Sequence, residues 1–267
     1  MTQHPALHAR LLLVGCGKMG GALLKGWKEQ HPNLSIIVVD PAAPDADFHS
    51  ASDVSGSFDC IILAVKPQVM TETVIQLKHL VLPATLILSI AAGKPIPFFE
   101  SLLDVRQPVI RVMPNTPAAI GYGMSVLCAN SHVTSMQKDL ATLLMSSVGL
   151  AEWIDDENLM DAVTAVSGSG PAYVFHLIES LAEAGKSVGL PADLSMKLAQ
   201  QTVIGSALLA QQSDRLDAAT LRQNVTSPGG TTEAALKVLM AEQSGLTDLM
   251  SRAVAAARNR GRELADK

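Results

Sequence analysis

The sequence predicts an α/β domain that is followed by an all-helical domain. Up to about residue 156, short apolar runs alternate with helix-like stretches, and each run ends in small or turn-forming residues. From about Asn158 onward, apolar residues recur with helical spacing and no run is typical of a strand. A chain of 267 residues is long enough for two domains, which we place at residues 1–156 and 157–267.

Residues 10–27 read as a buried strand, a glycine-rich loop and the start of a helix. Gly15, Gly17 and Gly20 form a G-x-G-x-x-G pattern, which allows a tight turn, close approach of a pyrophosphate and close helix packing. The next strand ends in Asp40, about twenty residues later, where an acid accepts hydrogen bonds from a ribose 2′-OH. We therefore expect a Rossmann-type dinucleotide-binding domain, because a glycine turn that only packs would not explain Asp40.

The same alternation continues through the first domain. Later apolar runs predict strands near residues 59–65, 85–90, 109–113, 124–128 and 151–154, with a helix near residues 134–148. The carboxyl ends of parallel strands gather at one edge of an open α/β sheet, and that edge binds the ligand.

The second domain contains helices that are too apolar to be covered by one chain. Helices are expected near residues 172–185 and 192–211, and the first is apolar on more than one face. The Ser-Gly-Ser-Gly-Pro sequence at residues 167–171 is expected to separate helices. Because so few helices cannot bury this surface alone, we expect a core that is shared in a homodimer.

Composition excludes several classes of protein. The net charge is −5 and basic residues are scattered, which argues against nucleic acid as a partner. Cys16, Cys60 and Cys128 form no CxxC motif and favour a reduced, cytoplasmic compartment. No apolar run approaches the roughly 18 residues of a membrane span, and no cluster has the spacing of a metal site.

A second glycine-containing loop lies near the end of the chain. Pro228, Gly229 and Gly230 interrupt the preceding structure, and Thr231 is the predicted N-cap of a helix with Glu233 in its first turn. The unpaired N–H groups of such a loop suit a carboxylate or a phosphate. An ordinary junction between a loop and a helix is the alternative interpretation.

Taken together, six motifs resemble the pyrroline-5-carboxylate reductase family over nearly the whole chain. They are VGCGKMGGAL, ILAVKPQ, SIAAG, RVMPNTPA, DAVTAVSGSGPAYVF and LRQNVTSPGGTTEAAL. Related enzymes of 3-hydroxy acids carry a lysine on the helix after the interdomain glycines, where this chain reads PAYVFHLIES without one. The resemblance implies reduction of 1-pyrroline-5-carboxylate to L-proline, the last step of proline biosynthesis, by NADH or NADPH. It also implies a homodimer or a ring of dimers.

The resemblance assigns residues to two sites. The implied cofactor-binding residues are Val14, Gly15, Cys16, Gly17, Lys18, Met19, Gly20, Asp40, Ala64, Val65, Lys66, Pro67, Ala91, Ala92 and Gly93. The implied substrate-binding residues are Glu157, Asn224, Ser227, Gly229, Gly230, Thr231 and Thr232. N–H groups at residues 230–232 would hold the substrate carboxylate. Thr232 would act in catalysis by bonding the ring nitrogen, although it could also serve only as a capping residue.

Other candidate residues have simpler interpretations. His176 lies on an apolar helix and is expected to be a core residue, and Cys16 is expected to be a small loop residue. Arg111 could lie near the cleft or be a solvated or capping charge, and Lys66 could meet a phosphate or stay in solvent. Because no cation follows Asp40 closely, we expect NADH to be used at least as well as NADPH.

Two rival functions stay open at this stage. One is a sensor that binds a dinucleotide without turnover, which the SPGGTT loop disfavours because a sensor needs no carboxylate site. The other is an NADP-linked reductase of a different cyclic imine, which competition by L-proline would disfavour.

Overall fold

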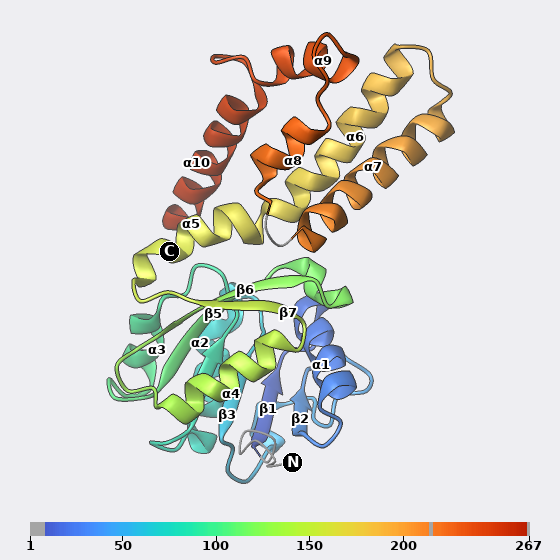
Figure 1. The fold of residues 1–267 in the computed structure, drawn as a ribbon. Helices are drawn as coiled ribbons and strands as arrows, with labels where there is room; N and C mark the ends of the chain where they lie inside the picture. The colour runs from blue at the N-terminus through green and yellow to red at the C-terminus, as the bar shows by residue number, and fades with distance from the viewer. Residues whose placement is uncertain (1–8, 214–215, 266–267) are drawn as a thin grey trace. The chain divides into compact units, whose positions relative to one another are not determined.

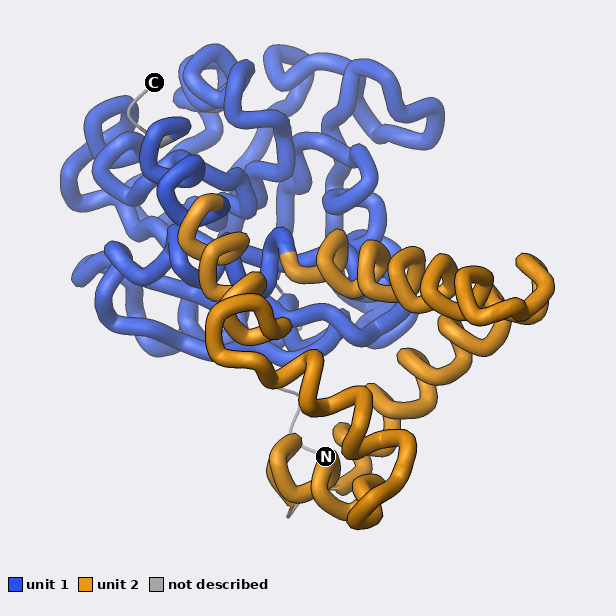
Figure 2. Tube along the Cα trace, turned by 90° about the horizontal axis from the view of Figure 1, so that it is seen from above, with its two compact units in different colours: residues 1–169, 257–267 blue, residues 170–256 orange. Residues whose placement is uncertain are grey.

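The computed structural model describes residues 9–213 and 216–265, and the chain divides into two compact units (Figures 1 and 2). Unit 1 comprises residues 1–169 and 257–267, and unit 2 comprises residues 170–256. The boundary between the two units therefore falls after Ser169, and helix α10 (Leu246–Ala265) contributes to both units. The expected functional boundary after residue 156 stays a prediction.

Unit 1 is built on one seven-stranded sheet in the order β2-β1-β3-β4-β5-β6-β7. Strands β2, β1, β3, β4 and β5 are parallel, β6 is antiparallel to β5, and β7 is parallel to β6. The strands are β1 (Arg10–Val14), β2 (Ser35–Val39), β3 (Cys60–Leu63), β4 (Leu86–Ser89), β5 (Val109–Met113), β6 (Gly123–Ala129) and β7 (Gly149–Trp153). The predicted α/β fold is confirmed, and β1 is the point where the strand order reverses, which is where such sheets bind ligands.

Alternate side chains of β1 enter two separate hydrophobic layers. Leu11 and Leu13 pack with α1 (Lys18–Gln30) and α4 (Ser135–Ser146), whereas Leu12 and Val14 pack with α2 (Met70–Leu77) and α3 (Ile96–Leu102). Helices therefore cover both faces of the sheet, as Figure 1 shows. Because both faces are buried, the strands are continuous apolar runs, and this made them recognisable in the sequence.

Short helical turns connect these elements. They are η2 (Ala51–Asp53), η3 (Pro67–Val69), η4 (Lys78–Leu80), η5 (Thr116–Ile120) and η6 (Glu157–Leu159). They are followed by α5 (Met160–Val163), the π-helical turn η7 (Thr164–Gly168), a bend at Ser169 and α6 (Gly170–Ser187). The glycine-rich segment therefore separates α5 from α6, as predicted, although part of it is helical itself. It forms a wide helical turn, and Asn115 Nδ2 donates to the Ser167 carbonyl at 3.2 Å there.

Unit 2 contains the whole of α6, with α7 (Ala192–Gln212), α8 (Ala218–Asn224), α9 (Thr231–Leu239) and the first part of α10. Gly185 lets α6 and α7 approach closely, because a Cβ atom there would lie 2.1 Å from Ser195 Oγ. Among the described residues of this unit, the buried side chains are those of Ala182, Ser195 and Ala199. Unit 2 therefore lacks a large apolar core within a single chain.

Two expectations about single residues change in the structure. His176 is exposed rather than buried, because it lies on an open face of α6, and its Nδ1 lies 3.1 Å from Glu179 Oε2. Arg111 is a buried side chain paired with Glu157, so it is not a solvated charge. None of the described helices is long and apolar enough to cross a membrane.

Candidate active site

The three glycines of the first loop meet different surroundings. Gly15 has φ +95°, and a Cβ atom there would lie 2.7 Å from the Ala64 carbonyl oxygen. A Cβ atom on Gly20 would lie 2.2 Å from the Gly15 carbonyl oxygen. At Gly17, by contrast, a Cβ atom would meet no atom within 4 Å. The chain itself requires Gly15 and Gly20, whereas Gly17 faces open space and suits a ligand that approaches the backbone, as a pyrophosphate does.

Asp40 holds the glycine loop from the end of β2. Its Oδ2 accepts the Cys16 N–H at 2.6 Å, and its Oδ1 accepts the N–H groups of Ala42 and Ala43 at 2.8 and 2.9 Å. Partial burial opposes the charge, but these three donors outweigh it and hold the pKa of Asp40 below its ordinary value. Burial, followed by the negative charge of Asp40, raises the pKa of the Cys16 thiol. Asp40 is thus ionised and already bonded to the loop that it was expected to flank.

The other expected cofactor residues follow neighbouring strands. Val14 ends β1, and Lys18 and Met19 begin α1. Ala64, Val65, Lys66 and Pro67 follow β3, and Lys66 is exposed. Ala91, Ala92 and Gly93 form the turn after β4, where Gly93 has φ +71°, a conformation that favours glycine. All of these residues belong to unit 1 and lie beyond the carboxyl ends of parallel strands.

A cavity of about 680 Å³ lies within unit 1 beside two of these turns. Pro67 and Gln68 line it after β3, and Ala92, Gly93 and Lys94 line it after β4. Its remaining lining comes from Thr71 of α2, from the segment 161–169 and from residues 257–264 of α10. A space of this size beside the expected cofactor residues is sufficient for part of a dinucleotide.

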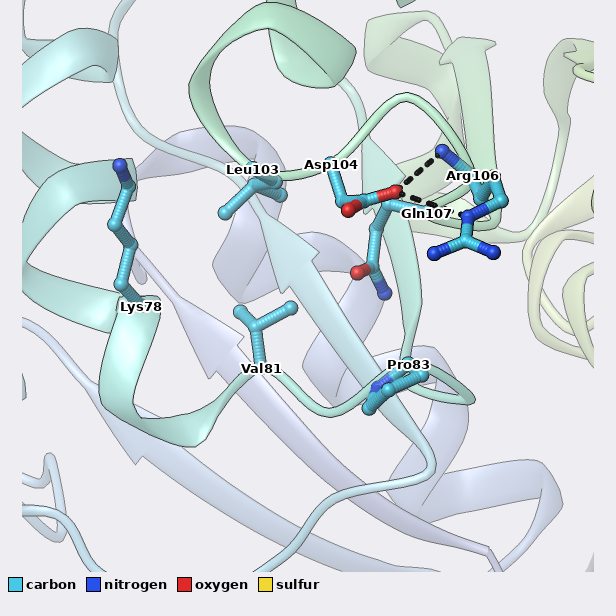
Figure 3. Close-up of a pocket in the computed structure, with 7 residues that line it drawn as sticks. All are labelled: Lys78, Val81, Pro83, Leu103, Asp104, Arg106 and Gln107. Atoms are coloured by element: carbon cyan, nitrogen blue, oxygen red, sulfur yellow. Dashed lines mark hydrogen bonds and ion pairs between the residues drawn. The ribbon is translucent and has the colours of Figure 1, made fainter.

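A second cavity, of about 480 Å³, lies near the opposite ends of the strands (Figure 3). Val81 and Pro83 line it ahead of β4, and Arg106 and Gln107 line it ahead of β5, so it lies near the amino ends of the strands. Asp104 Oδ1 accepts the Arg106 N–H at 2.8 Å in its wall. It contains none of the residues that the sequence selects, and open α/β sheets bind their ligands at the other edge.

Sequence reasoning missed two polar connections at the carboxyl edge. Asn115 accepts the Met124 N–H at 2.8 Å with its Oδ1 and donates to Ser167 with its Nδ2. Glu157 Oε1 accepts both Arg111 Nη1 and the Ile96 N–H, each at 2.9 Å. The signal available in the sequence was a lone charge, Arg111, inside an apolar strand, because a buried charge needs a partner. Its partner lies 46 residues away and carries no local signature.

The substrate loop in unit 2 differs in detail from the expectation. Gly230, rather than Thr231, is the N-cap of α9, and Thr231 is its first helical residue. Gly229 has φ +72°, and its N–H donates to Glu233 Oε2 at 2.7 Å. The Gly230 N–H donates to the Ser227 carbonyl at 3.0 Å. The first-turn N–H groups of Thr231, Thr232 and Glu233 have no acceptor within their helix and are the donors suited to an anion.

The remaining expected substrate residues flank this loop or belong to unit 1. Asn224 is the last residue of α8 and is exposed, as is Ser227, whereas Thr232 is half-buried. Glu157 belongs to unit 1 with the cofactor residues. Within the described parts of the chain, no group of three or more His, Cys, Asp or Glu side chains is arranged to hold a metal ion.

A glycine-rich loop after the first strand of a mostly parallel sheet, followed by a helical unit, is typical of dinucleotide-dependent oxidoreductases. Residues 10–93 match the family model described as "NADP oxidoreductase coenzyme F420-dependent", and residues 157–264 match "Pyrroline-5-carboxylate reductase dimerisation". Pyrroline-5-carboxylate reductase of Pseudomonas aeruginosa is 40% identical over 97% of this chain and 97% of its own length. The enzyme of Glycine max is 40% identical over the same shares. The chain belongs to the pyrroline-5-carboxylate reductase family.

Solved structures agree with this assignment. The pyrroline-5-carboxylate reductase of Coxiella burnetii has a TM-score of 0.88 at 33% identity and covers 96% of this chain and 98% of its own. The Plasmodium falciparum pyrroline carboxylate reductase with NADP bound has a TM-score of 0.83 at 31% identity, with the same coverage. A ketol-acid reductoisomerase from an uncultured archaeon has a TM-score of 0.65 at 12% identity and shares the fold alone.

Proposed function

We propose that this chain reduces the C=N bond of 1-pyrroline-5-carboxylate to give L-proline, with NADH or NADPH as the reductant. The observation that carries the proposal is its relationship to reductases of this name across the full chain, including both units. A dinucleotide cradle without the substrate loop would support only a binding protein. This chain has both, and the loop keeps its first-turn N–H groups.

In this proposal, unit 1 holds the cofactor through its glycine loop and three strand ends. The open space at Gly17 receives the pyrophosphate, and the N–H groups at the start of α1 face its charge. Asp40 borders the adenosine ribose, while the turns of residues 64–67 and 91–93 line the remainder of the cofactor. When bound, the reduced nicotinamide supplies the hydride that the imine carbon accepts.

The substrate loop holds the imine and supplies orientation rather than a strong acid. The N–H groups of Thr231 and Thr232 bind the substrate carboxylate, and the Thr232 hydroxyl bonds to the ring nitrogen, which ends the reaction protonated. Asn224, Ser227, Gly229 and Gly230 shape the loop around them. A hydroxyl with an ordinary pKa is a poor acid, so Thr232 orients the ring and relays a proton.

The test is loss of reduced nicotinamide absorbance when the purified chain is mixed with 1-pyrroline-5-carboxylate. Appearance of L-proline in equal amount identifies the product, and added L-proline should inhibit in competition with the imine. Binding of dinucleotide without turnover would instead identify a sensor. Turnover of another cyclic imine, with no competition by L-proline, would identify a reductase of different specificity.

We further propose a homodimer in which α6 and α7 are shared, with a ring of dimers as a higher assembly. The supporting observation is the row of exposed apolar side chains on both helices, such as Phe175, Leu181, Leu198 and Leu209. A cytoplasmic location is part of the proposal, since all three cysteines are free thiols. Nucleic acid is not a proposed partner, because the net charge is −5.

A further inference from the structure

A buried arginine lies at the carboxyl edge of the sheet. Arg111 occupies β5 opposite Ser89 of β4 and Cys128 of β6, and its side chain is 8% exposed. A guanidinium in such a place requires a charged partner. Its Nη1 donates to Glu157 Oε1 at 2.9 Å, and the Glu157 side chain is 23% exposed. The pair thus joins β5 to η6 through a contact that is largely shielded from water.

The same carboxylate oxygen also caps a helix. Helix α3 begins at Ile96, and its N-cap, Pro95, makes no side-chain cap bond. The Ile96 N–H donates instead to Glu157 Oε1 at 2.9 Å, across 61 residues of sequence. Glu157 therefore supplies the acceptor that the helix start itself lacks.

These two contacts border a turn that is expected to touch the cofactor. Strand β4 ends at Ser89 and α3 begins at Ile96, so residues 90–95 form the turn between them. Arg111 lies level with Ser89, where the turn begins, and Glu157 bonds to Ile96, where it ends. The turn includes the left-handed Gly93 and lines the 680 Å³ cavity. The ion pair therefore begins on the strand residue beside the start of the turn and is hydrogen-bonded to the residue at its end.

We propose that Glu157 and Arg111 are positioning residues that hold the turn of residues 90–95 against the cofactor, and that Glu157 acts through this turn rather than by contact with the substrate. The inference rests on the proposed function, because the turn matters only if a dinucleotide binds there. Its physical basis is that a displaced binding group loses much of its effect within about 1 Å. The Ile96 N–H and the Arg111 charge would both lose their partner if the carboxylate were removed.

The experiment measures the cofactor Kd in the absence of imine, by nicotinamide fluorescence, for Glu157→Ala and Glu157→Gln. We expect Glu157→Ala to raise the Kd about 10- to 100-fold, the range that corresponds to one buried donor or charge left unpaired. Glu157→Gln keeps an acceptor for Ile96 and should recover most of the loss, leaving about a threefold increase. At saturating cofactor, the KM for the imine should stay within about twofold of wild type in both variants.

Glu100→Ala is the matched control. Glu100 lies on α3, the helix that follows the turn of residues 90–95, and it has no part in that turn. Its Oε1 accepts a hydrogen bond from Asn130 Nδ2 at 2.8 Å. This variant should lower the Tm without changing the cofactor Kd by more than about twofold. An equal rise in Kd for Glu100→Ala and Glu157→Ala would overturn the proposal, since general loosening would then be the cause.

Further outcomes separate the alternatives. An unchanged cofactor Kd with a raised imine KM would overturn the proposal and make Glu157 a substrate contact. If Glu157→Ala does not fold, Glu157→Gln decides, and a Kd equal to that of wild type would overturn the positioning role. A wild-type chain that binds no dinucleotide would contradict the proposed function itself, which is a different result from any of these.

Discussion

The Asp40 carboxylate accepts the backbone N–H of Cys16 at 2.6 Å, so the end of β2 is bonded directly to the glycine loop. Asp40 is therefore both a charge beside the expected ribose and a part of the loop's own structure. Its three backbone donors leave it ionised, and no cation is among the groups that hydrogen-bond its carboxylate. This double role has consequences for cofactor choice and for the response to acid.

The chain should use NADH at least as well as NADPH, because an ionised Asp40 repels the 2′-phosphate of NADPH. Two like charges at a half-exposed site repel by about 1–4 kcal/mol, up to about a thousandfold in affinity. We predict that kcat/KM with NADH at least equals that with NADPH. Asp40→Asn and Asp40→Ser should both move the ratio toward NADPH. A wild-type preference of about tenfold or more for NADPH would show that Asp40 does not read the ribose.

The two Asp40 variants should differ in one respect. Asparagine retains an oxygen that can accept the Cys16 N–H or those of Ala42 and Ala43, whereas serine is too short to replace them all. Asp40→Ser should therefore also raise the Kd for NADH, and Asp40→Asn should raise it less. Equal Kd values for NADH would mean that the backbone bonds do not shape the loop.

Acid should destabilise the chain partly through Asp40. Its pKa in the folded chain is lowered, so its contribution to stability is present above the unfolded pKa of about 4 and is lost as the pH falls through the folded value. We predict that the free energy of unfolding of wild type exceeds that of Asp40→Asn at pH 7, and that this difference shrinks below about pH 4. Urea titrations of both proteins across this range measure it. A difference in the free energy of unfolding that does not change with pH would contradict a stabilising role for the ionised Asp40 carboxylate.

The fold could be predicted from the sequence because the signals for its strands and its glycine loop are local. Buried parallel strands are continuous apolar runs, and the glycine pattern at residues 15–20 fixes where the first strand ends. The connections at the site are not local. Glu157 meets Arg111 and Ile96 only after the sheet has formed, and the three donors to Asp40 depend on the shape of two loops. The change of N-cap from Thr231 to Gly230 is a shift of one residue, which propensity does not resolve because both residue types are found at N-caps.

Gly17 and Gly15 should respond differently to the same substitution. Gly17 has φ −70° and open space around its missing Cβ, so Gly17→Ala should leave the Tm near that of wild type while weakening cofactor binding about tenfold or more. Gly15→Ala requires φ +95° and a 2.7 Å contact with Ala64, so it should lower the Tm strongly. Gly21→Ala, with an ordinary 3.5 Å contact, is the control that should retain both properties. Normal binding by Gly17→Ala would argue against the pyrophosphate cradle.

Thr232→Val should lower kcat/KM about 10- to 1000-fold, as expected when one orienting hydrogen bond at a reacting centre is lost. Neither Thr231 nor Thr232 caps α9, because Gly230 holds that position without a side-chain bond, so the Tm should barely change. Thr231→Val is the matched control and should affect kcat/KM less, since its proposed contact is its backbone N–H. Wild-type kinetics in Thr232→Val would leave the hydroxyl with no role in the reaction.

The helices of unit 2 should assemble with a second copy of the chain. Phe175 on α6 is 60% exposed in the single chain, and the unit buries only three small side chains among its described residues. A surface of that kind is covered in a stable protein. We predict that sedimentation at low micromolar concentration gives a dimer or a multiple of one. Phe175→Asp should shift the protein to smaller species or cause aggregation, because it places a charge on the covered face. Val105→Asp, at a site in unit 1 that is 67% exposed, should leave the mass unchanged. A wild-type chain that sediments as a stable monomer would exclude the shared core.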